Sequence, residues 1–234
     1  MEAPPVPSAL DSSRDASCLK CHDVGWVHPG QCAADVIPCP DCNSQEEQRT
    51  RARLAYAGIP DTQRCATFES FKRLPRTEAA YNAAHDLVFG APFTMVLLVG
   101  PYGNGKTHLA YAAVREAAKM GMRAKFVYFP DMLAEYRRRI DRNEEPQVYV
   151  EEIKRVQFLA LDEIGFLNAT AFQEGLLEEL VNHRYNEGLH TIMTTNRDYQ
   201  TLPGPILSRF KDKAVAKMVL NKGEDYRPKR KVAK

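Results

Sequence analysis

The chain has 234 residues, of which 44% are hydrophobic and 26% are charged, and its formal net charge is +2. This length suits one α/β domain with a small appendage, and the composition is typical of a globular protein. No apolar run approaches the roughly 18 residues that a membrane span requires, and the start of the chain lacks the basic and apolar regions of a secretory signal. These features exclude an integral membrane protein and predict a cytoplasmic location. The proline-containing N-terminus predicts a disordered leader over residues 1–15.

Two pairs of cysteines follow the leader, with 17 residues between the pairs. They are Cys18, Cys21, Cys39 and Cys42. This spacing is typical of a structural zinc site, because two tight turns can present four thiolates to one tetrahedral ion. The alternatives are a disulfide framework, which needs an oxidising compartment, and a redox-active pair, which needs a βαβ unit. We predict a zinc-binding module over residues 16–44, in which His22, His28 or Cys32 could replace one ligand.

A helical linker is predicted over residues 45–60, because a capping residue and acidic side chains are followed by basic ones and by Gly58. The segment that comes next leads to an alanine-rich helix over residues 77–89. This segment could line an adenine pocket, or it could simply pack Phe68 and Phe71 into the core.

A glycine-rich loop lies between an apolar strand over residues 94–99 and an alanine-rich helix over residues 108–119. The loop, Gly100–Thr107, has the pattern G-x-x-x-x-G-K-T, in which glycines let successive N–H groups point at a phosphate. Lys106 is expected to contact the β/γ-phosphates, and the Thr107 hydroxyl is expected to bind Mg²⁺. A surface turn that matches by chance is the alternative, but the flanking strand and helix favour a nucleotide site.

A strand over residues 124–129, a helix over residues 130–140 and a short amphipathic helix over residues 147–154 are predicted next. Three consecutive arginines occupy positions 137–139, beside Tyr136. They could contact nucleic acid, or they could form a solvated face of the helix.

The apolar strand over residues 156–163 ends in Asp162 and Glu163. Acids after an apolar run often only cap a helix, but downstream of a phosphate loop this ending is the Walker B pattern. Asp162 would hold Mg²⁺ through water, and Glu163 would orient and deprotonate the attacking water. The second acid indicates hydrolysis, since phosphoryl transfer to a small substrate does not require it.

Two helices and two strands are predicted in the remainder of the domain. They are a helix over 170–187, a strand over 189–196, a short helix over 205–210 and a strand over 214–220. Asn196 at a strand tip could hydrogen-bond the γ-phosphate or the attacking water. Arg209 could reach the nucleotide of a neighbouring subunit, or it could be an ordinary surface arginine. The last strand completes a five-stranded parallel sheet, and little chain remains for a helical lid.

The two ends of the chain differ in charge. Residues 1–50 carry three basic and eight acidic side chains, whereas residues 211–234 carry nine basic and three acidic ones. The basic tail over residues 224–234 could follow a phosphate backbone or could be a solvated chain end.

The chain resembles the DnaC/DnaI replicative-helicase loaders and their relatives, the IstB transposition ATPases, over roughly residues 45–228. The shared segments are the AGIP…ATFESF lead-in, GPYGNGKTHLA, LALDEIG, TTN, LSRF and GEDYR. The resemblance implies an α/β P-loop ATPase domain of the ASCE/AAA+ class over residues 61–223, with a minimal lid. It implies ATP contacts from Gly100, Gly103, Asn104, Gly105, Lys106, Thr107, His108 and Arg227, the last as a sensor 2-like arginine. It also implies Mg²⁺ contacts from Thr107 and Asp162, and catalytic roles for Glu163, for Asn196 as sensor 1 and for Arg209 as an arginine finger.

The cysteine-rich module resembles the zinc-binding, helicase-contacting domain of the DnaI type, which IstB proteins generally lack. The resemblance therefore implies a loader that places a hexameric DnaB-type helicase on single-stranded DNA and self-associates through its ATP sites. Its cofactors would be ATP, Mg²⁺ and Zn²⁺. Two alternatives remain, an IstB-like transposition regulator and a nucleotide-binding zinc adaptor with little turnover.

Overall fold

A five-stranded parallel sheet forms the centre of the molecule. The computed structural model describes residues 20, 26–27, 37–39, 45–165 and 169–226. The sheet has the order β4-β5-β6-β3-β7. Its strands are β3 (Met95–Val99), β4 (Ala124–Tyr128), β5 (Phe158–Asp162), β6 (His190–Thr195) and β7 (Ala216–Leu220). All residues of β3 and β5 are buried, as expected for strands that are covered on both faces. The predicted α/β class and the parallel sheet are confirmed.

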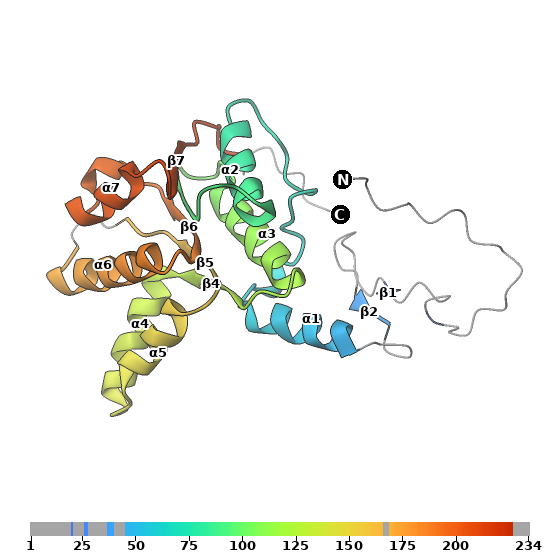
Figure 1. Cartoon of the computed structure of the whole chain (residues 1–234), viewed down its shortest axis with the longest axis horizontal. Coiled ribbons are helices and arrows are strands. Elements are labelled where there is room, and N and C mark those ends of the chain that lie inside the picture. The colour runs from blue at the N-terminus through green and yellow to red at the C-terminus, as the bar shows by residue number, and fades with distance from the viewer. Residues whose placement is uncertain (1–19, 21–25, 28–36, 40–44, 166–168, 227–234) are drawn as a thin grey trace, which may run out of the picture.

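Helices cover both faces of this sheet and make a three-layer sandwich (Figure 1). One face is covered by α1 (Gln45–Tyr56), α2 (Glu78–Phe89) and α3 (Lys106–Lys119). The other face is covered by α4 (Phe129–Asp141), α5 (Pro146–Lys154), α6 (Ala171–Asn186) and α7 (Gly204–Lys211). Two 3₁₀ turns, η1 (Asp61–Gln63) and η2 (Tyr199–Thr201), lie in the connections. Alternate residues of each strand supply the two separate apolar cores.

The alanine content of α2 and α3 has a packing reason. Ala80, Ala83 and Ala84 of α2 are fully buried, as are Ala112 and Ala113 of α3. Small side chains at these positions let the two helices pack close to each other and to the sheet. The start of α3, which follows the phosphate loop directly, is thereby held against the sheet.

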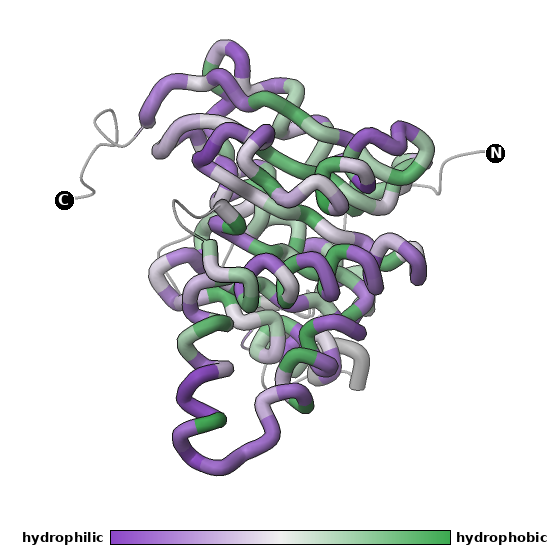
Figure 2. Tube along the Cα trace, turned by 90° about the vertical axis from the view of Figure 1, so that its left-hand side faces the viewer, coloured by the Kyte–Doolittle hydropathy of each residue, from purple (hydrophilic) through white to green (hydrophobic). Residues whose placement is uncertain are grey.

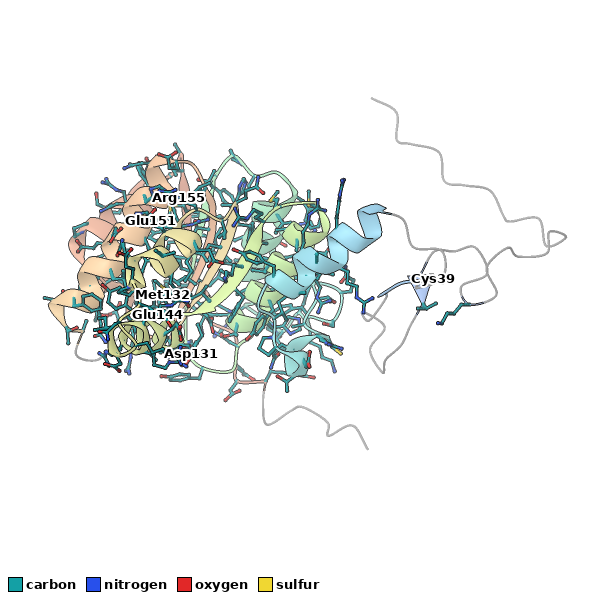
Figure 3. All side chains as sticks on the ribbon, turned by 90° about the horizontal axis from the view of Figure 1, so that it is seen from below. Cys39, Asp131, Met132, Glu144, Glu151 and Arg155 are labelled. Atoms are coloured by element: carbon teal, nitrogen blue, oxygen red, sulfur yellow. The ribbon has the colours of Figure 1, made fainter. Side chains whose placement is uncertain are left out.

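The chain before the sheet is packed onto it through α1. The N–H of Phe126 in β4 donates to the carbonyl of Ala57, just after α1, at 2.8 Å. Ahead of α1, a short antiparallel pair joins β1 (Trp26–Val27) to β2 (Ile37–Pro38). Cys39 follows β2 and is buried beside Val27 (Figure 3). The other predicted zinc ligands, Cys18, Cys21 and Cys42, lie outside the described residues.

Helices α4 and α5 form a hairpin whose far end is mostly hydrophilic (Figure 2). Two of the three arginines on α4 have an acidic partner, because Arg138 and Arg139 both pair with Glu135. Arg155, just after α5, pairs with Glu151 of α5 at 2.8 Å (Figure 3). These contacts describe an ion-paired helix face. No helix among the described residues is long and apolar enough to cross a membrane.

Candidate functional site

The phosphate loop needs glycine at two positions for steric reasons. Gly103 and Gly105 have φ angles of 76° and 89°, which L side chains rarely adopt. A Cβ on Gly105 would lie 2.5 Å from Cε2 of Phe71. The loop therefore curls closely against the lead-in segment, and Gly105 leads directly into the N-terminus of α3.

Lys106 lies on the inner side of the curled phosphate loop and bonds to its polar groups. Its Nζ donates to the carbonyls of Gly100 and Pro101 at 2.8 and 2.7 Å, and to Oδ1 of Asn104 at 3.1 Å. Only 4% of the residue is exposed. A cation on the concave side of the loop is suited to bind phosphate oxygens, which would compete with these neutral acceptors.

Thr107 and Asp162 come from different elements and meet at the same point. The Thr107 hydroxyl lies 3.2 and 3.1 Å from the two carboxylate oxygens of Asp162, at the carboxyl end of β5. Burial raises the pKa of Asp162, as does the neighbouring Glu163, while hydrogen bonds from Thr194 and Thr107 lower it. A carboxylate and a hydroxyl are hard oxygen donors, so this pair fits Mg²⁺.

Glu163 has a left-handed backbone, with φ of 61°. Its N–H donates to Oγ1 of Thr194 at 3.1 Å, and its carboxylate accepts a hydrogen bond from the side-chain amide of Asn196. Strand β6 lies between β5 and β3, so Asn196 at its end sits between the two acids and the phosphate loop. The sequence predicts this position for Asn196, and it does not point to Thr194.

The segment after β7, of which residues 224–226 fall in the predicted basic tail, lies against the phosphate loop. After β7, Asn221 and Asn104 exchange hydrogen bonds, from each side-chain amide to the other's main-chain carbonyl, at 2.8 and 3.0 Å. The N–H of Tyr226 donates to the carbonyl of Gly103 at 3.0 Å. A Cβ on Gly103 would lie 1.7 Å from Oδ1 of Asp225. We call residues 221–226 the closing segment. Arg227 comes next and lies outside the described residues.

His108 faces the lead-in segment. Its Nε2 lies 2.7 Å from the carbonyl of Thr67, so this nitrogen carries the proton. Burial lowers the pKa of His108, and its ring packs edge-on against Phe71. Phe68 and Phe71 are both buried, which agrees with the simple packing interpretation of this segment. His108 thus ties the lead-in to α3, beside the loop.

Arg209 lies on α7 and contacts α6. Its Nε donates to Oδ1 of Asn182 at 3.2 Å, and its guanidinium lies 4.9 Å from the centre of the Tyr185 ring. The site residues that the structure does bring together are Lys106, Thr107, Asp162, Glu163 and Asn196. Arg209 is held on a separate helix pair.

Residues 43–231 match the model of the IstB-like ATP binding protein family. The chain belongs to this family. It is therefore an AAA+ P-loop ATPase, and the resemblance seen in its motifs is confirmed. A protein described as the ATP-binding protein of insertion sequence IS21 from Pseudomonas aeruginosa is 27% identical over 198 residues, which is 81% of this chain and 73% of that protein.

Two solved structures share the fold. The DnaC helicase loader aligns with a TM-score of 0.60 and 21% identity, covering 70% of this chain and 100% of that one. DnaI aligns with a TM-score of 0.61 and 22% identity, covering 75% of this chain and 99% of that one. At these identities the likeness concerns the architecture of the ATPase domain.

Proposed function

We propose that this IstB-like ATPase loads a DnaB-type replicative helicase onto single-stranded DNA and hydrolyses ATP between its own subunits. The observation that carries the ATPase part is the meeting of Thr107 with Asp162, with Lys106 and Glu163 alongside. A cation, a hydroxyl and two carboxylates at one edge of a parallel sheet are the groups that ATP hydrolysis needs.

Each of these residues has a role in the proposal. Lys106 binds the β/γ-phosphates together with the N–H groups of the loop, and Thr107 and Asp162 hold Mg²⁺, which neutralises phosphate charge when bound. Glu163 orients the attacking water and accepts its proton. Asn196 contacts the γ-phosphate or the attacking water. Before ATP binds, its side-chain amide donates a hydrogen bond to the carboxylate of Glu163.

Arg209 and Arg227 have proposed roles at the nucleotide sites of the assembled protein. Arg209 contacts α6 of its own chain, on a helix pair separate from the phosphate loop, and we assign it a role at the nucleotide of an adjacent subunit. Arg227 follows the closing segment, whose last described residue is bonded to Gly103, and this supports a role beside the same subunit's nucleotide. ATP would thereby order the assembly, and its hydrolysis would release the loader.

The N-terminal cysteines support helicase loading over other tasks of the family. The family match begins at residue 43, directly after Cys42, so the cysteine-rich segment lies outside the matched range. We propose that Cys18, Cys21, Cys39 and Cys42 bind Zn²⁺ and that residues 16–44 contact the helicase. The DnaC and DnaI folds match the ATPase domain, which agrees with the same task.

An IstB-like role in transposition is the second candidate. The IS21 ATP-binding protein resembles this chain over most of both lengths, and its name connects it to an insertion sequence. In that case a transposase would replace the helicase as the partner. A zinc adaptor with little turnover is the third candidate, because the carboxylate of Glu163 is already engaged by the hydrogen bond from the Asn196 amide.

Steady-state ATP hydrolysis, with and without single-stranded DNA, tests the enzymatic part. We expect turnover that depends on Mg²⁺. Glu163→Gln should bind ATP but lose about 10²- to 10⁴-fold in turnover, while Lys106→Ala should lose ATP binding. Equal turnover of the wild type and Glu163→Gln under all conditions would support the adaptor instead.

Purified partners distinguish loading from transposition. The full-length chain is mixed with a hexameric replicative helicase or with an IS21-type transposase, and complexes are measured by size-exclusion chromatography. Loading predicts a helicase complex and helicase activity on protein-coated single-stranded DNA. Cys39→Ser should abolish the complex and keep ATP binding, whereas a complex with the transposase alone would exclude the loading proposal.

A further inference from the structure

Thr194 is the residue through which β6 holds both acids of the site. It is buried, with 1% of its surface exposed. Its hydroxyl donates to Oδ1 of Asp162 at 2.5 Å and accepts the N–H of Glu163 at 3.1 Å. Its main-chain carbonyl accepts the N–H of Ile164 at 3.0 Å. One residue therefore binds three consecutive residues of the neighbouring strand end.

These bonds set the direction of both carboxylates. Asp162 accepts the Thr194 hydroxyl at Oδ1, and the Thr107 hydroxyl lies within hydrogen-bond distance of both carboxylate oxygens, which leaves the carboxylate little rotational freedom. Glu163 has a positive φ of 61°, a conformation that a side chain disfavours and that neighbouring bonds must maintain. Its N–H is bonded to Thr194, so the turn that aims its carboxylate at Asn196 depends on the same hydroxyl.

We propose that Thr194 is a positioning residue for ATP hydrolysis, in which one hydroxyl aligns the Mg²⁺-binding and the water-activating carboxylates together. This inference rests on the roles proposed for Asp162 and Glu163. A hydroxyl suits the position because it donates and accepts at once. The branched Cβ of threonine also suits a buried strand.

Substitutions at Thr194 distinguish the contribution of its hydroxyl from that of the shape of its side chain. Thr194→Val keeps the volume and removes both hydrogen bonds, and it should lower kcat by about 10- to 100-fold, as loss of an outer partner does at metal sites. The KM for ATP should change less than about threefold, because the contacts of Lys106 with the loop remain. Thr194→Ser, which restores the hydroxyl, should regain activity to within about threefold of the wild type.

A binding measurement gives a second readout that does not depend on turnover. The affinity for a fluorescent ATP analogue is measured at increasing Mg²⁺ concentrations. Thr194→Val should need about tenfold more Mg²⁺ than the wild type to reach half of the maximal gain in affinity. In the absence of Mg²⁺ its affinity should equal that of the wild type, which also shows that the variant is folded. If Thr194→Val does not fold, Thr194→Cys is used, since a thiol is a weak hydrogen-bonding group.

Thr94→Val is the matched control. Thr94 is a half-buried threonine whose Oγ1 is shielded from solvent and has no hydrogen-bond partner among the residues that the structure describes. The same substitution there should leave kcat and the Mg²⁺ dependence unchanged.

The outcomes separate this inference from the proposed function. Wild-type kcat and Mg²⁺ dependence in Thr194→Val, with Glu163→Gln inactive, would overturn the role of Thr194 and leave the ATPase intact. Equal loss in Thr194→Val and Thr194→Ser would also overturn it, because the methyl group would then matter and not the hydroxyl. Full activity of Glu163→Gln would refute the proposed function itself.

Discussion

Replacing Arg184 tests how a fully buried cation stabilises the end of the sheet opposite the nucleotide site. Arg184 of α6 has no exposed surface. Its Nε donates to the Thr191 hydroxyl at 2.8 Å, its Nη1 to the carbonyls of Lys154 and Val156 at 2.9 and 2.8 Å, and its Nη2 to the carbonyl of His190 at 2.7 Å. The guanidinium thus ties α6 to the chain just before β5 and to the start of β6. Burial lowers the pKa of Arg184 to about 9.

Arg184→Met keeps the length of the side chain and removes all four hydrogen bonds. Two of the acceptors, Thr191 and the carbonyl of Val156, are buried, and each would cost about 1–3 kcal/mol when left unsatisfied. The carbonyls of Lys154 and His190 are partly buried, so water can replace their partner. Removing a desolvated cation offsets part of this cost, but the acceptors remain. We expect a net loss of about 3 kcal/mol in the free energy of unfolding.

Thermal and urea unfolding measure this loss. For a chain of this length, about 3 kcal/mol corresponds to a fall in Tm of roughly 6–12 °C. Arg155→Met is the control, because Arg155 is an exposed arginine paired with Glu151 at 2.8 Å, and such a pair contributes at most about 1 kcal/mol. A fall in Tm as small as that of Arg155→Met would show that the four hydrogen bonds add nothing net. ATP affinity at 20 °C should stay unchanged in both variants.

Three further changes address the site itself. Gly103→Ala should weaken ATP binding about tenfold in a fluorescence titration, because the new Cβ would overlap Asp225 and the positive φ would cost about 1–2 kcal/mol. A second change, Asp225→Ala, should recover part of the affinity. Burial lowers the pKa of His108 in the folded protein. Below about pH 6.5 the imidazole therefore binds a proton more readily in the unfolded chain than in the folded one, so the free energy of unfolding should fall from pH 7.5 to pH 5.5. His108→Gln should reduce this slope in urea titrations, and an unchanged slope would contradict the assignment. Arg209→Ala should spare ATP binding and lower turnover, and equal turnover at high protein concentration would exclude a finger at this position.

Much of the fold is determined by local features of the sequence. Each strand of the sheet is a short apolar or β-branched run, and each helix begins and ends near a recognisable signal, as α1 does before Gly58. Thr170 and Gln173 form a reciprocal capping box at the start of α6. The phosphate loop and the Asp162-Glu163 ending are contiguous motifs, so their chemistry could be predicted before their geometry was known.

The tertiary structure alone decides the contacts between residues that are far apart in the chain. The closing segment meets the phosphate loop across 117 residues, in the pair Asn104 and Asn221. Thr194 holds Asp162 across 32 residues, and it resembles any other strand threonine in the sequence. The side chain of His108 contacts the carbonyl of Thr67 across 41 residues, and its place in the motif does not reveal this contact.

The sequence by itself determined that this chain has a P-loop, a Walker B acid pair and a parallel α/β domain, because these depend on residue types at fixed local spacing. Only the tertiary structure decided how the acid pair is held and what covers the loop. Those features depend on which strands become neighbours, and strand order results from packing of the whole core. A hydroxyl acquires its role from the partner that this packing places within hydrogen-bond distance.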